Sequence, residues 1–139
     1  MKKVAFILFI AMLLAACQSP ATAQPPAPVE TLATSASDFI GIWWYPKAGV
    51  KVEYKADGTF RVYGSEAIGE LDKGNYSFDA GKLTTISTSS SCTDNPATYE
   101  VYVTRQDGNP VSIRLQVVGE DTCQSRAGVL AEEGKFQKP

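Results

Sequence analysis

Apolar and polar residues alternate over short stretches from about residue 38 to the end of the chain. The clearest stretch is 50–63 (VKVEYKADGTFRVY), where apolar residues take every second position on either side of Asp57-Gly58. A period of two is that of a β-strand with one buried face, and Asp-Gly favours the tight turn of a hairpin. This segment therefore predicts a β-hairpin.

Similar stretches follow, each separated from the next by turn residues. They are 76–79, 82–90, 98–105 and 111–118, with imperfect alternation in 82–90 and turn signals at Gly81, Pro96 and Asp107-Gly108. With FIGIWWYP (39–46) at the start and a short strand near the end, we expect about eight strands. An apolar piece, AGVLA (127–131), follows Arg126, and 66–71 and 131–135 can each hold one turn of helix.

Short strands at this regular spacing predict an all-β domain, either a sandwich or a barrel. Consecutive hairpins without long crossovers favour a small antiparallel up-and-down barrel of about eight strands. The inward-facing candidates are Val50, Val52, Tyr54, Phe60, Val62, Tyr76, Phe78, Tyr99, Val101, Val103, Ile113, Leu115 and Val117.

The interior of such a barrel is just wide enough to be filled by side chains or to hold one small ligand. Both outcomes stay open at this point. If a pocket exists, it is apolar with tyrosine hydroxyls that orient the ligand. Its expected lining is Tyr54, Phe60, Phe78, Tyr99, Val101 and Leu115.

The first 37 residues have a different composition. Lys2 and Lys3 precede an apolar run of 13 residues, 4–16, which is too short to span a bilayer as a helix. Together they are typical of a secretory signal peptide. The segment 18–37 holds four prolines and few large apolar residues, so we expect it to form a flexible tether.

The end of the apolar run, Leu14-Ala15-Ala16-Cys17, resembles the lipobox of bacterial lipoproteins. The resemblance implies cleavage before Cys17 and attachment of diacylglycerol and a further acyl chain, such as palmitate, to that cysteine. It divides the chain into a signal peptide (1–16), a lipidated cysteine with its tether (17–37) and a folded domain (38–139). The protein would be lipid-anchored in the cell envelope, and Gln18 is compatible with the periplasmic face of the outer membrane in a Gram-negative bacterium.

Charge narrows the range of partners. Removal of 1–16 takes away two of the 13 basic residues, leaving 11 against 15 acidic ones, a net charge of −4. No basic patch stands out, so nucleic acid is not an expected partner. About 100 residues remain after the tether, enough for one domain, which we expect to be a monomer.

The chain has three cysteines and no histidine. With Cys17 assigned to lipid, Cys92 and Cys123 remain, and an exported protein meets conditions that permit disulfides. A metal site would need more ligands, and a nucleophilic cysteine would need a base. We therefore expect a Cys92–Cys123 disulfide, no metal, no cofactor, no catalytic residues and no enzymatic activity.

A second resemblance concerns the folded domain. Gly41-Ile42-Trp43 is similar to the Gly-x-Trp signature that opens the first strand of lipocalin-like (calycin) barrels. The order Cys92, Tyr99, Asp121, Cys123, Arg126 also resembles small bacterial lipocalin-like domains, over about 38–130. The resemblance implies that Arg126 packs across Trp43 and closes one end of the barrel, a contact that cation–π attraction favours.

Two functions fit these observations. The first is a membrane-anchored protein whose barrel binds a small apolar ligand. The alternative is an envelope protein-interaction module, for example a hydrolase inhibitor, that acts through the barrel rim and has a filled interior. If Phe60, Phe78 and Tyr99 meet without leaving a void, the alternative is favoured.

Overall fold

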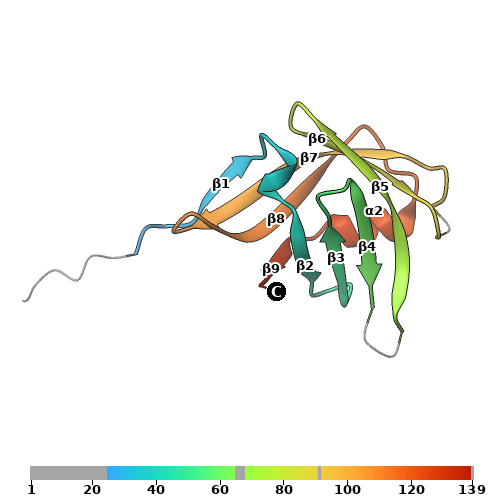
Figure 1. Cartoon of the computed structure of the whole chain (residues 1–139), viewed down its shortest axis with the longest axis horizontal. Helices are drawn as coiled ribbons and strands as arrows, with labels where there is room; N and C mark the ends of the chain where they lie inside the picture. Colours follow the sequence, from blue (N-terminus) through green and yellow to red (C-terminus); the bar gives the residue numbers. More distant parts are fainter. Residues whose placement is uncertain (1–24, 65–67, 91, 139) are drawn as a thin grey trace, which may run out of the picture.

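The computed structural model describes residues 25–64, 68–90 and 92–138, in which eight antiparallel strands form a closed barrel (Figure 1). Each barrel strand pairs with the strands before and after it, and the pairing of the last strand with the first closes the ring. The predicted up-and-down barrel is thereby confirmed. The strands are β2 (Gly41–Tyr45), β3 (Val50–Tyr54), β4 (Thr59–Tyr63), β5 (Glu70–Asp79), β6 (Lys82–Ser87), β7 (Ala97–Gln106), β8 (Asn109–Val118) and β9 (Gly134–Gln137).

The expected tether is shorter than the sequence indicated. Residues 17–24 lie outside the described part, but β1 (Val29–Leu32) forms a ninth strand on β7, and η1 (Ala36–Asp38) is a 3-10 turn. The reason is that β7 extends beyond β6. The strand β6 pairs with residues 97–100 of β7, and β1 pairs with residues 102–105. Arg114 on β8 also holds Glu30 through two hydrogen bonds, of 3.0 and 2.8 Å.

An aromatic cluster fills one end of the barrel. The ring of Phe39, which is fully buried, lies 5.4 Å from that of Tyr54, 5.7 Å from that of Tyr76 and 5.1 Å from that of Phe78. Tilted and edge-on arrangements at these distances are the favourable ones for aromatic pairs. Because Phe39 follows η1 directly, the N-terminal segment closes this end.

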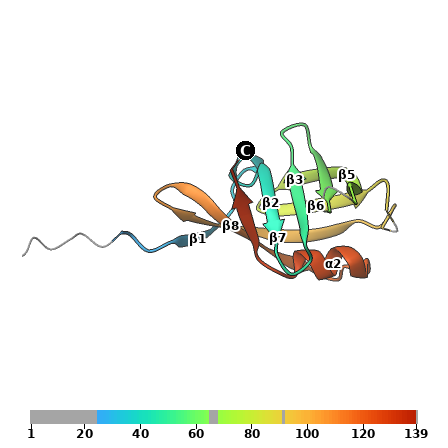
Figure 2. The ribbon, with the colours of Figure 1, turned by 90° about the horizontal axis from the view of Figure 1, so that it is seen from below.

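The chain after Arg126 differs from the prediction. The apolar piece 127–131 belongs mostly to a helix, α2 (Gln124–Leu130), on the opposite side of the molecule from β1 (Figures 1 and 2). Arg126, Val129 and Leu130 are spaced i, i+3 and i+4, which places them on one helical face. The expected helical turn at 131–135 is instead a connection, 131–133, and the first two residues of β9. The other expected turn, 66–71, lies partly outside the described residues, and its last two residues, Glu70 and Leu71, begin β5.

Most of the predicted inward positions are buried or half-buried. Val117 is the exception: it lies at the end of β8 and is 44% exposed. The alternation did not identify Trp43, Tyr45 and Leu83, all of which are fully buried.

Gly74 permits close packing between β5 and its neighbours. A Cβ atom at this position would overlap the carbonyl oxygen of Ile86 and lie 2.7 Å from Cε1 of Phe60. We expect Gly74→Ala to lower the free energy of unfolding by about 1–3 kcal/mol, as overpacking does. Urea unfolding measures the loss. Gly128→Ala, in α2 with open space around it, is the control and is expected to be neutral or stabilising; equal losses in both variants would contradict the packing argument.

Candidate ligand-binding site

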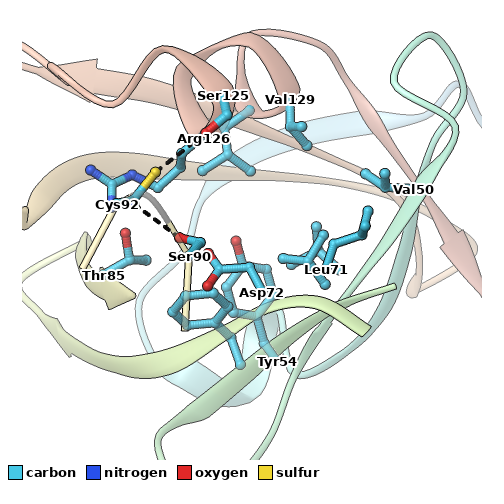
Figure 3. A pocket seen from close by; sticks show the side chains of 14 residues that line it. Val50, Tyr54, Leu71, Asp72, Thr85, Ser90, Cys92, Ser125, Arg126 and Val129 are labelled. Carbon is cyan, nitrogen blue, oxygen red and sulfur yellow. Dashed lines mark hydrogen bonds between the residues drawn. The ribbon is translucent and has the colours of Figure 1, made fainter. Parts of the chain in front are cut away.

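A cavity of about 360 Å³ lies between the inner faces of β3 to β6 and the helix α2. Figure 3 shows side chains of α2 on one side of it and Tyr54, Leu71 and Asp72 on the facing side. The lining residues are Val50, Val52, Tyr54, Phe60, Val62, Leu71, Asp72, Thr85, Ser90, Cys92, Ser125, Arg126, Val129 and Leu130. The interior is therefore filled at the aromatic end and hollow beside α2.

The structure places the six expected lining residues in two groups. Tyr54 and Phe60 do line the cavity. Phe78 packs in the aromatic cluster, while Tyr99, Val101 and Leu115 are buried in the core away from the cavity wall. The reason is α2, which places the hollow part of the barrel beside β3 to β6, away from β7 and β8.

A β-bulge shapes the cavity wall on β5. Val62 pairs with Asp72 and Tyr63 with Glu70, so Leu71 is an extra residue without a partner on β4. An extra residue in one strand bends it and re-aims its side chains. Both Leu71 and Asp72 consequently line the cavity, where regular alternation would send them to opposite faces.

The cavity has an apolar end and a polar end. In Figure 3, Thr85, Ser90 and Cys92 lie toward one end, and Val50 and Val129 toward the other. Valine and leucine side chains dominate the apolar end. A molecule that fills the cavity therefore meets hydrocarbon over most of its surface and polar groups at one extremity.

Thr85 and Asp72 contribute a hydroxyl and a carboxylate to the cavity wall. Thr85 is 2% exposed, and its hydroxyl oxygen has no hydrogen-bond partner among the described residues. Asp72 accepts a hydrogen bond of 2.7 Å from the hydroxyl of Ser87 and one of 2.8 Å from the backbone N–H of Lys73. Neither residue was predicted to line the cavity. Burial of Leu83 is the signal that indicates Thr85, because Thr85 lies two residues further along β6 and therefore on the same face.

Arg126 lines the cavity and forms a buried ion pair with Asp121. Its Nε and Nη2 donate to the carboxylate of Asp121 at 2.9 and 2.7 Å, and its Nη1 donates to the backbone oxygen of Asn95 at 2.8 Å. The hydroxyl of Tyr99 also donates to Asp121. Burial raises the pKa of Asp121, but the hydrogen bonds from Arg126, Tyr99 and the Cys123 amide lower it by more, so it lies below the ordinary value.

The predicted disulfide is confirmed. Cys92 and Cys123 are bonded, with their Cα atoms 5.6 Å apart. Cys92 lines the cavity, and Cys123 immediately precedes α2. The bond therefore ties the start of α2 to the segment that follows β6, and so holds one wall of the cavity against another.

Trp43 and Arg126 do not form the expected stacked pair. The indole of Trp43 donates to the backbone oxygen of Phe39 at 2.8 Å and lies 5.0 Å from the ring of Phe136. Within the described ranges, the cation–π contact is that of Arg114 over Tyr102, at 4.1 Å. Arg126 lies in a helix rather than a strand, and its guanidinium forms an ion pair with Asp121.

Comparison with known proteins gave no match. No family model fits the chain, and searches of curated proteins and of solved structures returned no significant similarity. These comparisons therefore show neither the lipocalin-like nor the lipoprotein family for this chain, and Cys17 lies outside the described residues.

Two further findings concern only the part of the chain that the structure describes. In that part, no helix combines the length and the apolar character that crossing a bilayer requires. The same residues contain no group of three or more His, Cys, Asp or Glu side chains placed to hold a metal ion.

Proposed function

We propose that the barrel binds one small, mostly apolar molecule in the cavity beside α2. The observation that carries the proposal is the hollow itself, about 360 Å³ in a domain otherwise packed with aromatic side chains. Small-molecule sites range from about 300 to 1,000 Å³ and combine apolar walls with a few polar groups. At about 30 Å³ per non-hydrogen atom, taking the volume share of a liquid water as the guide, the cavity holds roughly a dozen atoms.

The proposal includes the location of the protein. We propose that the chain is exported, lipidated on Cys17 and held as a monomer on the cell-envelope membrane, where the barrel binds its ligand without catalysis or cofactor. The supporting observation is the motif Leu14-Ala15-Ala16-Cys17 after a short apolar run. Two or more acyl chains would make the attachment stable.

The hollow interior also bears on the alternative, a rim-binding inhibitor with a filled barrel. Phe78 packs at the closed end with Phe39, while Phe60 stands on the cavity wall, so these rings leave a void beside α2. This arrangement favours the ligand-binding proposal over the rim-binding one.

A cavity-filling substitution tests the proposal. Val62 lines the cavity from β4 and is half-buried, so a larger ring can enter the hollow without displacing the closed core. We expect Val62→Phe to weaken the binding of naphthalene, a purely apolar probe of ten carbons, by about tenfold or more, because the added ring takes up space in a site of this size. Equilibrium dialysis of the purified protein measures the affinity.

Val118→Phe supplies the matched control. Val118 is 38% exposed and pairs with Thr98, which is on the outer face of β7. The same change in volume there is expected to leave naphthalene binding unaltered. Absence of naphthalene binding to the unmodified protein, or equal binding by both variants, would refute the cavity as the site.

A further inference from the structure

We infer that the ligand carries a hydrogen-bond-donating head, an alcohol or an amine, and that this head binds at the Thr85–Asp72 end of the cavity. This inference rests on the proposed function and specifies the chemical class of the ligand. It excludes the carboxylate of a fatty acid as the preferred head. Three observations support it: the unpartnered hydroxyl of Thr85, the neutral hydrogen-bond partners of Asp72 and the charge balance around Arg126.

The hydroxyl of Thr85 needs a partner. A hydroxyl has one donor hydrogen and can accept two hydrogen bonds, and leaving it buried without a partner costs free energy. Thr85 is 2% exposed and lines the cavity, and Figure 3 shows its hydroxyl directed toward the α2 side. A polar group on a bound molecule satisfies this hydroxyl, whereas a pure hydrocarbon does not.

Asp72 sets the sign of charge that the polar end accepts. Its partners are neutral donors, the hydroxyls of Ser87 and Ser89 and the backbone N–H of Lys73, and none of the ion pairs in the described residues includes it. The side chain of Lys73 pairs instead with Glu70 at 3.1 Å. Since an ionised carboxylate only accepts hydrogen bonds, Asp72 attracts a head that donates them.

Ser87 links Thr85 and Asp72. Ser87, which donates to Asp72, is two residues from Thr85 on β6, and both face the interior. An alcohol head that exchanges hydrogen bonds with Thr85 therefore lies two residues along β6 from the hydroxyl that donates to the Asp72 carboxylate. An ammonium head gains further from the charge of that carboxylate, and a carboxylate head is repelled by it.

The positive charge of Arg126 does not reverse this preference. Its carboxylate partner, Asp121, accepts two of its hydrogen bonds, and the side chains of the pair are 7% and 2% exposed. A guanidinium has five N–H donors, of which three are engaged with Asp121 and Asn95. Together Asp72, Asp121 and Arg126 carry a net charge of −1, so the polar end favours a neutral or cationic head.

Ligands that differ only in their head group test the inference. The purified protein is titrated with 1-decanol, decylammonium and decanoate by isothermal titration calorimetry at neutral pH. We expect 1-decanol and decylammonium each to bind about tenfold more tightly than decanoate, because Asp72 repels the anionic head and neither of the other two.

Two substitutions locate the effect. Thr85→Val, which keeps the side-chain shape, is expected to weaken 1-decanol by about 2- to 12-fold, the net contribution of one hydrogen bond. Asp72→Asn is expected to remove the preference for decylammonium over decanoate. The controls are Thr104→Val, on the outer side of β7, and Asp79→Asn, at the exposed end of β5; neither is expected to change the ranking of the three ligands.

Naphthalene separates failure of the inference from failure of the proposed function. If naphthalene binds but decanoate equals or exceeds the other two ligands, the cavity is a binding site and the inferred head group is wrong. If the ranking survives Asp72→Asn, or if 1-decanol is indifferent to Thr85→Val, the Thr85–Asp72 end is not the head-group site. If neither naphthalene nor any decyl compound binds, the proposed function itself is wrong.

Discussion

Asp121→Asn is expected to lower the free energy of unfolding by about 3–5 kcal/mol, because it leaves the charge of Arg126 buried without a counter-charge. The replacement keeps the size of the side chain, so the loss reports charge rather than volume. The pair is nearly inaccessible, with side chains that are 7% and 2% exposed and 2.7 Å apart. Urea unfolding at neutral pH measures the effect.

The same substitution at an exposed ion pair provides the control. Glu30 and Arg114 also form two hydrogen bonds, but their side chains are 42% and 40% exposed. Exposed ion pairs contribute at most about 1 kcal/mol, so Glu30→Gln is expected to cost no more than that. Removing both buried charges, with Asp121→Leu and Arg126→Met together, is expected to recover most of the loss; a double variant as unstable as Asp121→Asn would contradict the charge argument.

The pH dependence of stability in acid tests the contribution of the Asp121 carboxylate independently. The pKa of Asp121 is below its ordinary value in the folded state, so the stability that its ionisation provides is present above the unfolded pKa. That stability falls as the pH drops below about 4, near the ordinary pKa of aspartate. The stability of Asp121→Asn should consequently depend less on pH over this acidic range than that of the unmodified protein.

The barrel strands with one apolar face were predictable from sequence. In β3, burial follows the alternation of Val50, Val52 and Tyr54 with their polar neighbours, because every second side chain of a strand faces the same side. In β6 the buried positions alternate as well, but they do not hold apolar residues throughout. This strand buries Thr85 and Ser87 and leaves Ile86 40% exposed. Of the polar residues that obscured the pattern there, Thr85 lines the cavity and Ser87 donates a hydrogen bond to Asp72, which also lines it.

The elements that sequence analysis missed depend on the rest of the fold. β1 pairs with the part of β7 that β6 leaves unpaired. The sequence of residues 29–32 contains no alternating pattern that predicts this pairing. α2 has only seven residues, too few for its 3.6 period to stand out. The bulge at Leu71 is visible only in the register between β4 and β5.

The cavity was predictable in part for the same reason. Tyr54 and Phe60 belong to regular strands, and alternation assigned both to the interior. Asp72 enters the wall through a bulge and Arg126 through a helix, neither of which the alternation indicates. The disulfide followed from a count of cysteines, whereas its position beside the cavity depends on the three-dimensional fold.

Removal of the disulfide by Cys92→Ala with Cys123→Ala is expected to lower the free energy of unfolding by about 3–4 kcal/mol. The two cysteines are 31 residues apart, and a loop of that length loses about this much chain entropy when it is closed in the unfolded state. The substitutions leave no thiol and no buried hydroxyl, so the change reports the lost cross-link. Urea unfolding of the variant, and of the unmodified protein with and without reductant, measures it.

The structural consequence should concentrate in α2. Cys123 precedes the helix, and its backbone oxygen accepts the N–H of Ala127 at 2.9 Å, so the cross-link fixes the first turn. We expect amide hydrogen exchange to rise most in residues 124–130 and naphthalene to bind more weakly, because Val129 and Leu130 of α2 form one wall of the cavity. Exchange that rises evenly over the barrel strands and α2 would show that the bond acts only on the unfolded chain. Equal urea midpoints for the oxidised and reduced protein would show that it contributes no stability.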